Sequence, residues 1–90
     1  MKPQEITTLS SVMLFYDFKQ ALYAEEYLTC KEIKEELIFR IQTGDLDLEL
    51  IEATQIAANI FPEKYGIKDL ETEVLNGLFE ECKTMAYLPA

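Results

Sequence analysis

The chain has 90 residues, of which 49% are hydrophobic, and its 17 acidic and 8 basic side chains, with no histidine, give a net charge of −9. We expect a chain of this length and composition, residues 1–90, to fold as one small domain with its own core. The negative charge argues against binding to nucleic acid or to an anionic membrane, because phosphate groups are bound by lysine and arginine.

The first predicted helix covers residues 6–27 and is apolar on two adjacent sides. One stripe contains Leu9, Val12, Met13, Tyr16, Tyr23 and Tyr27, and the other contains Phe15, Phe18 and Leu22. A small core does not usually absorb this many large rings, and tyrosine hydroxyls favour a wet edge, so we expect part of the helix to carry an interface. The candidate self-association residues, which would make a homo-oligomer, are Phe15, Tyr16, Tyr23 and Tyr27. The alternative is that these rings belong to the core.

A second helix is predicted to begin at Cys30, because Thr29 and Glu32 have the spacing of a capping box with Thr29 as the N-cap. On the outside of this helix, Glu36 and Arg40 are one turn apart and are expected to form an ion pair. The predicted buried stripe consists of Cys30, Ile33, Leu37 and Ile41.

The stretch from Asp45 to Leu50 alternates acids with leucines, which is typical of a half-buried strand. A longer pattern favours a helix instead, over about residues 46–61. Gly44 is expected to end the preceding helix in the left-handed conformation, Asp45 then stands at the N-cap, and Pro62 ends the new helix. The stripe expected to face the core is Leu46, Leu50, Ala53, Ala57 and Ile60.

The acids of the same stretch also have the odd-position spacing of a calcium-binding loop. That loop needs glycine at its sixth position and glutamate at its twelfth. Counted from Asp45, these positions hold Leu50 and Ile56, so we predict no metal site here.

Residues 62–68 are predicted to form a loop with a turn at Gly66, from which Tyr65 and Ile67 tuck back onto the core. Asp69 is expected to cap the next helix.

The last predicted helix covers residues 70–87 and has the clearest amphipathic pattern in the chain. Its apolar positions are Leu70, Val74, Leu75, Leu78, Phe79, Cys82 and Met85. Gly77 interrupts the pattern, and we expect it to permit the close approach of another helix or a slight bend. The predicted fold is therefore all-α, a small bundle of about four helices.

Cys30 and Cys82 have no metal-type spacing, the N-terminus lacks the pattern of a signal peptide, and no uncharged apolar stretch reaches the length of a membrane span. We expect a cytoplasmic protein with both thiols reduced and buried. A disulfide between them is the alternative that the sequence leaves open.

Catalysis and DNA binding are both disfavoured by the residues present. There is no histidine to act as a general base, and the only serines, Ser10 and Ser11, lie in an apolar helix without a candidate base. We therefore expect no enzymatic activity and no cofactor. The segment EEYLTCKEIKEEL has the look of the first helix of a helix-turn-helix, but no lysine or arginine occurs from Ile41 to Glu63, where the DNA-reading helix would be. Phosphates would repel that helix, so an ordinary helical hairpin is favoured.

Acidic side chains crowd the outer faces predicted for the third and fourth helices. The candidate partner-binding residues are Asp45, Glu49, Glu52, Glu71, Glu73 and Glu80. They would accept hydrogen bonds from arginine and lysine of a basic protein partner and give fast, salt-sensitive association. The alternative is a solvated face that only keeps the protein soluble.

The segment FRIQTGDLDLELIEATQIAANIFPEKYGIKDLETEVLNGLFEECKTM, about half of the chain, resembles the helical-bundle immunity proteins of the colicin D type. The similarity lies in a helix, a short turn with a glycine and an acid, a second helix, and a third with a Leu-x-x-Leu-Phe-like run, here residues 75–79. The first thirty residues of this chain have no counterpart in that family, and the C-terminal helix expected from the family is absent here. No functional residue is carried over. The resemblance implies an acidic bundle that plugs the cationic active site of a nuclease toxin.

Two hypotheses follow from the sequence. The first is an acidic, non-catalytic protein that blocks a basic macromolecular partner, as an immunity protein, an antitoxin or a phage-encoded inhibitor does. The second is a helical, self-associating structural or chaperone-like subunit.

Overall fold

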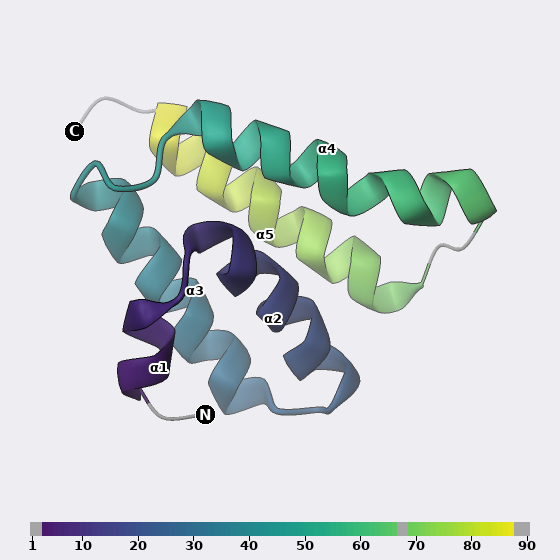
Figure 1. Ribbon diagram of the computed structural model, residues 1–90, viewed down its shortest axis with the longest axis horizontal. Helices are drawn as coiled ribbons and strands as arrows, with labels where there is room; N and C mark the ends of the chain where they lie inside the picture. The colour runs from purple at the N-terminus through teal and green to yellow at the C-terminus, as the bar shows by residue number, and fades with distance from the viewer. Residues whose placement is uncertain (1–2, 67–68, 88–90) are drawn as a thin grey trace.

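The computed structural model describes the backbone of residues 3–66 and 69–87 and the side chains of residues 6–66 and 69–87. These residues form five helices and no strand, so the predicted all-α fold is confirmed (Figure 1). The helices are α1 (Pro3–Thr8), α2 (Ser11–Tyr23), α3 (Tyr27–Gln42), α4 (Leu48–Tyr65) and α5 (Leu70–Tyr87). There is one helix more than expected, because residues 6–27 do not form a single helix.

The helices are arranged as two hairpins, α2 with α3 and α4 with α5, and α1 packs against α3 (Figure 1). Helix α5 contacts α2 and α3 as well as α4, so it makes most of the contact between the two hairpins. The rings of Phe15 and Phe79 stack at the α2–α5 contact with their centroids 4.4 Å apart. The shared core consists of Ile6, Leu14, Phe15, Phe18, Ala21, Cys30, Ile33, Leu37, Leu46, Ile51, Leu75, Leu78, Phe79 and Cys82.

The predicted first helix is interrupted at Ser10. The backbone of Ser10 is extended, with φ −66° and ψ 157°, and its hydroxyl accepts a hydrogen bond from the Met13 amide at 3.2 Å. A serine side chain that satisfies a free amide in this way favours a helix start over a helix interior. The chain therefore ends α1 and begins α2 where an uninterrupted helix was expected.

The second interruption separates α2 from α3. Glu25 has a left-handed backbone, with φ 57°, and the Glu26 amide donates to the Ala21 carbonyl at 2.9 Å. This is the hydrogen bond of a Schellman motif, which usually has glycine at the left-handed position. Helix α3 then begins at Tyr27, so the predicted N-cap at Thr29 is wrong, and Tyr27 does not belong to the first helix. Glu26 occupies the N-cap position and makes no side-chain capping bond.

The turn between α3 and α4 is longer than predicted. Gly44 has the expected left-handed backbone, with φ 82°. The N-cap of α4 is Asp47, whose carboxylate accepts from the Leu50 amide at 2.9 Å, and the prediction of Asp45 as the cap is wrong. The two extra residues allow the side chain of Leu46 to reach the core before the helix begins, and burial of a leucine contributes roughly 1.5–3 kcal/mol.

Helix α4 continues through Pro62, which was expected to end it, and stops at Gly66 with φ 68°. An interior proline costs about 3 kcal/mol because it removes a backbone hydrogen bond. Pro62 is buried, so packing of its ring offsets part of this cost. Tyr65 is exposed and does not tuck onto the core as expected, while the same expectation for Ile67 lies outside the described residues.

Helix α5 has the predicted boundaries and the predicted cap. The Asp69 carboxylate accepts from the Thr72 amide at 2.8 Å. The close approach of another helix expected at Gly77 is wrong, because a Cβ atom at this position would meet nothing within 4 Å, and the alternative of a slight bend stays a prediction.

Arg40 joins α3 to the N-terminal part of the chain. Its ion pair with Glu36, at 2.8 Å, was expected on the outside, yet Arg40 is only 8% exposed. The guanidinium also donates to the Ser11 hydroxyl at 3.1 Å and to the carbonyl oxygens of Ile6 and Thr7 at 3.2 and 3.3 Å. One buried cation therefore ties α1 and the start of α2 to α3.

Candidate partner-binding surface

The apolar stripe of α4 that was predicted to face the core faces outward instead. Only Leu46, which precedes the helix, is buried; Leu50 and Ile60 are 38% and 57% exposed, and Ala53 and Ala57 are exposed as well. The side of α4 that faces the core carries instead Ile51, Thr54, Ala58 and Pro62. The predicted orientation is wrong because α4 has apolar residues on both sides, so periodicity alone does not identify the buried one.

Further large apolar side chains lie on the same outward side. Ile56 is 66% exposed, and Phe61 is exposed and packs against the ring of Tyr65 with a centroid separation of 4.7 Å. We call these positions the outer face of α4, defined as Leu50, Ala53, Ile56, Ala57, Ile60 and Phe61. An exposed apolar strip of this kind is typical of a protein-interaction site.

Acidic residues flank the outer face of α4. Glu49, Glu52 and Glu63 are exposed, and among residues 6–66 and 69–87 no ion pair engages any of them. Asp45 is exposed in the preceding turn and accepts a hydrogen bond from the Thr43 hydroxyl at 3.2 Å. Within the described structure, these carboxylates are therefore left to interact with solvent or with a cationic partner.

Side-chain amides form a ladder along the contact between α4 and α5. Asn59 and Asn76 exchange two hydrogen bonds of 2.8 and 2.9 Å, and Gln55 donates to Asn76 at 3.3 Å and to Glu80 at 2.9 Å. The Lys83 ammonium, 2.7 Å from the Glu80 carboxylate, and the Gln55 amide lower the pKa of Glu80. Matched polar groups at a helix interface fix its register, so the ladder determines which side of α4 faces outward.

An open hollow of about 400 Å³ lies over the contact between α4 and α5. Its walls are the polar residues Gln55, Asn59, Glu63 and Asn76 and the apolar residues Ile56 and Ile60. The hollow thus continues the outer face of α4 and offers both apolar and hydrogen-bonding groups.

The hairpin separates the predicted partner-binding acids into two groups. Because Gln55 lies opposite Glu80 and Asn59 opposite Asn76, α4 and α5 are antiparallel (Figure 1). The structure therefore brings Asp45, Glu49 and Glu52 to the end of the hairpin where α5 finishes, with Glu80 nearer the middle. Glu71 and Glu73, in the first turn of α5, lie at the opposite end. The six acids do not form one continuous site.

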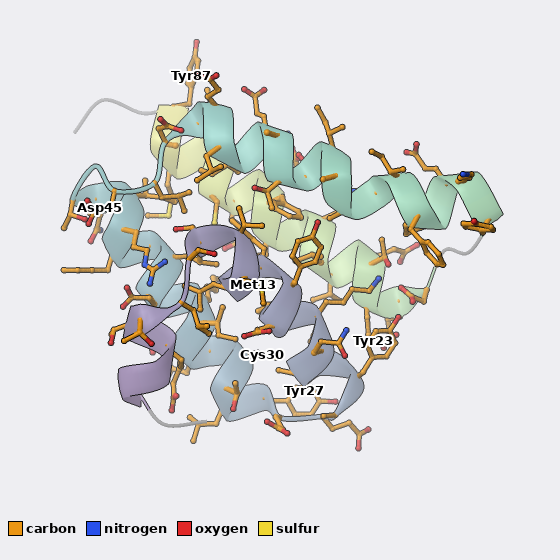
Figure 2. All side chains as sticks on the ribbon, in the orientation of Figure 1. Met13, Tyr23, Tyr27, Cys30, Asp45 and Tyr87 are labelled. Atoms are coloured by element: carbon orange, nitrogen blue, oxygen red, sulfur yellow. The ribbon has the colours of Figure 1, made fainter. Side chains whose placement is uncertain are left out.

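The candidate self-association residues also divide between different environments. Phe15 is 0% exposed and belongs to the core, so it is not available to a second molecule. Tyr16 and Tyr23 are partly exposed on α2, and Tyr27, 64% exposed, lies at the start of α3. Figure 2 shows Met13, Tyr23 and Tyr27 on the α2–α3 side of the molecule.

Tyr23 also has a structural contact. Its hydroxyl donates to the Asp69 carboxylate and so joins the end of α2 to the start of α5. This hydrogen bond and burial raise the pKa of Tyr23 to about 12. Hydrogen bonds from Thr72 and from Tyr23 lower the pKa of Asp69 to about 2.

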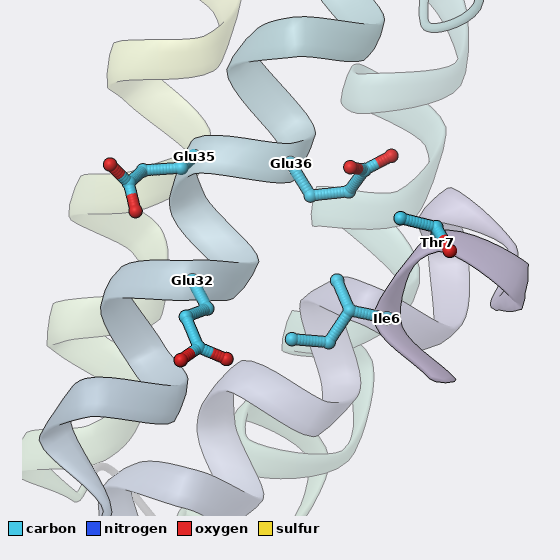
Figure 3. Close-up of a pocket in the computed structure, with 5 residues that line it drawn as sticks. All are labelled: Ile6, Thr7, Glu32, Glu35 and Glu36. Carbon is cyan, nitrogen blue, oxygen red and sulfur yellow. The ribbon is translucent and has the colours of Figure 1, made fainter. Parts of the chain in front are cut away.

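A second hollow lies between α1 and α3 and is lined by Ile6, Thr7, Glu32, Glu35 and Glu36 (Figure 3). Glu36 points toward α1 and pairs with Arg40, whereas Glu35 points away (Figure 3). No group of three or more histidine, cysteine, aspartate or glutamate side chains in the described parts of the chain is arranged to hold a metal ion.

The serine hydroxyls and the cysteine thiols all have structural surroundings. Ser10 caps α2, and Ser11 is buried against Arg40. Both cysteines are buried and free, as expected, and the Cys30 thiol lies 3.8 Å from the Phe18 carbonyl oxygen. Burial raises the pKa of Cys30 and raises that of Cys82 to about 11. Both thiols are therefore protonated and weakly nucleophilic at neutral pH.

No protein-family model, curated protein or solved structure matches the chain. The resemblance to immunity proteins of the colicin D type therefore stays a prediction. Among the helices described, none combines the length and the apolar character that a membrane crossing requires.

Proposed function

We propose that this protein is a small, acidic, non-catalytic binding protein that blocks a basic protein partner. One observation carries the proposal: the outer face of α4 combines exposed apolar side chains with the flanking carboxylates Glu49, Glu52 and Glu63. Lys64, in the last turn, is the only basic residue of α4, and no lysine or arginine occurs from Ile41 to Glu63. Apolar contacts then supply affinity, and the charge supplies fast and selective encounter.

The remaining features support the same function. The serines have structural contacts, the thiols are protonated, and the chain has no histidine, so catalysis has little chemistry to use. Two free cysteines suit the reducing cytoplasm, where we propose that the protein acts. Immunity protein, antitoxin and phage-encoded inhibitor are the versions of this function that we favour.

A capture experiment tests the proposal. The tagged protein is incubated with lysate from its source cells at low ionic strength, and bound protein is released by a salt step and identified by mass spectrometry. We expect a basic protein, and we expect the double variant Glu49→Lys/Glu52→Lys to lose it. The matched control is Glu26→Lys/Glu35→Lys, which changes the net charge equally at exposed sites away from α4. Equal capture by both double variants would rule out this surface, and the absence of any basic protein would contradict the function.

Self-association is the second candidate function, and the exposure of Tyr16, Tyr23 and Tyr27 favours it. Leu28, adjacent to Tyr27, is exposed as well. A structural or chaperone-like subunit would show a defined oligomeric mass by light scattering, and Tyr27→Ser/Leu28→Ser would reduce that mass without unfolding the chain. A monomeric mass at high protein concentration would exclude this function.

A further inference from the structure

The outer face of α4 has the form of one half of a two-helix interface. We propose that the partner contributes an amphipathic α-helix with basic flanks, which packs lengthwise along this face. The proposal rests on the proposed function, because it specifies how the basic partner is bound.

The spacing of the exposed apolar residues supports a helix as the bound segment. Leu50, Ala53, Ala57 and Ile60 are separated by three, four and three residues and all lie on the outer face. This is the spacing of the contact positions in a coiled coil, and it produces a straight apolar seam along the helix. Ala53, Ala57 and Ile60 are exposed, whereas Leu50 is 38% exposed and lines a hollow together with Phe39 and Arg40.

The sizes of these residues also suit a helix. Ala53 and Ala57 lie in the middle of the seam, and their small side chains permit the close approach of a second backbone. Leu50 and Ile60 stand on either side of them as large anchors, and Ile56 and Phe61 widen the apolar surface. A partner helix with large apolar side chains opposite the two alanines would fill the space between the anchors.

The charges specify the flanks of the partner helix. Leu50, Ala53, Ala57 and Ile60 are the a and d positions of a heptad, so Glu49 and Glu63 fall at g positions. Side chains at g lie beside the apolar seam and pair with residues of the facing helix in a coiled coil. Glu52 adds a third carboxylate along the same edge. Lysine or arginine at the facing positions would pair with these acids, which no cation engages within the described residues.

The same charges disfavour a second copy of this chain as the occupant. An antiparallel pair of α4 helices would place Glu49 of one copy near Glu63 of the other, so that like charges face each other. A parallel pair would place the Lys64 side chains of the two copies opposite each other in the seam. The net charge of −9 on each molecule adds to the repulsion.

A designed peptide serves as the probe, because it separates helical recognition from charge. The peptide contains about three heptads with leucine at both contact positions and lysine elsewhere, labelled with a fluorophore, and this length supports helix formation on binding. The control peptide has the same composition, but its leucines are rearranged so that a helix has no apolar seam. Binding to the full chain is measured by fluorescence anisotropy at low and at physiological salt.

The matched protein variants are Ile60→Ser and Leu70→Ser. Both side chains are exposed, Ile60 on the outer face of α4 and Leu70 at the start of α5, so each substitution leaves the core intact. We expect the amphipathic peptide to bind more tightly than its control, and Ile60→Ser to weaken that binding roughly tenfold, the factor that accompanies lost burial of a large aliphatic side chain. Leu70→Ser should leave the binding constant unchanged.

Three other results would overturn this inference in distinguishable ways. Equal binding of both peptides, unaffected by Ile60→Ser, would show recognition by charge alone, which contradicts the helix seam but leaves the proposed function intact. Failure of both peptides, together with no basic protein in the capture experiment, would contradict the inference and the proposed function alike. A dimeric mass in light scattering that Ile60→Ser reduces to the monomer would identify a second copy as the occupant.

Discussion

Replacement of Arg40 by alanine should produce one of the largest losses of stability that a polar substitution gives in this chain. The guanidinium of Arg40 has four acceptors: the Glu36 carboxylate, the Ser11 hydroxyl and two backbone carbonyls of α1. The substitution leaves Glu36, whose side chain is 17% exposed, without its counterion. Removing one partner of a buried ion pair costs about 3–5 kcal/mol. For a chain of this size that corresponds to a fall in Tm of roughly 12 °C or more, at about 4 °C or more for each kcal/mol.

The pair between Lys34 and Glu81 provides the matched control. It has the same 2.8 Å separation and also involves α3, but its side chains are 41% and 59% exposed. Exposed pairs contribute about 0–1 kcal/mol, so Lys34→Ala should change the free energy of unfolding little. Urea unfolding followed by circular dichroism compares the two variants. Free energies of unfolding within about 1 kcal/mol of each other would refute the conclusion that burial makes the Arg40 contacts strong.

The site of the effect is also testable. Because Arg40 holds the carbonyl oxygens of Ile6 and Thr7, its removal should release α1 before the rest of the fold. Relative to the unsubstituted protein, Arg40→Ala should therefore increase the native-state hydrogen-exchange rate more in α1 than in α5. A uniform increase across all helices would mean that Arg40 stabilises the whole fold rather than the attachment of α1.

Three further predictions concern the helix ends and the core. Glu25→Gly should raise the free energy of unfolding by about 1 kcal/mol in chemical denaturation, because glycine adopts the left-handed backbone at this position without strain; a loss of stability would contradict this role. The pKa of Asp69 is lowered from 3.8 to about 2, so its contribution to stability is present above pH 4 and is lost as the pH falls toward 2. Asp69→Asn should therefore flatten a plot of Tm against pH between pH 4 and 2. An unchanged slope would contradict the role of Asp69. Phe79→Ala should cost about 3–5 kcal/mol of unfolding free energy, whereas Tyr27→Ala should cost about 0.5 kcal/mol or less, and a large loss for Tyr27→Ala would show that its ring is buried in solution.

The local features of the fold were predictable from short stretches of sequence. Gly44 and Gly66 have the left-handed backbone, and Asp69 caps a final helix with the predicted boundaries. Each depends on groups within a few residues of one another, so the neighbouring sequence contains the physical cause. The breaks at Ser10 and Glu25 are equally local but escaped prediction, because serine occurs in helix interiors as well as at caps, and Glu25 lacks the usual signal of a glycine.

The candidate surface could be identified only from the tertiary structure. The sequence identifies α4 as amphipathic and surrounds it with acids, but Ile51 and Ile60 are equally apolar, and only the register between α4 and α5 decides which of them is buried. The same holds for Phe15 and Tyr16, which are adjacent in α2 and of similar size, because contact with Phe79 selects Phe15 for the core. Periodicity determines that a helix forms and has an apolar side, whereas the side that remains for a partner is decided by packing between segments distant in sequence.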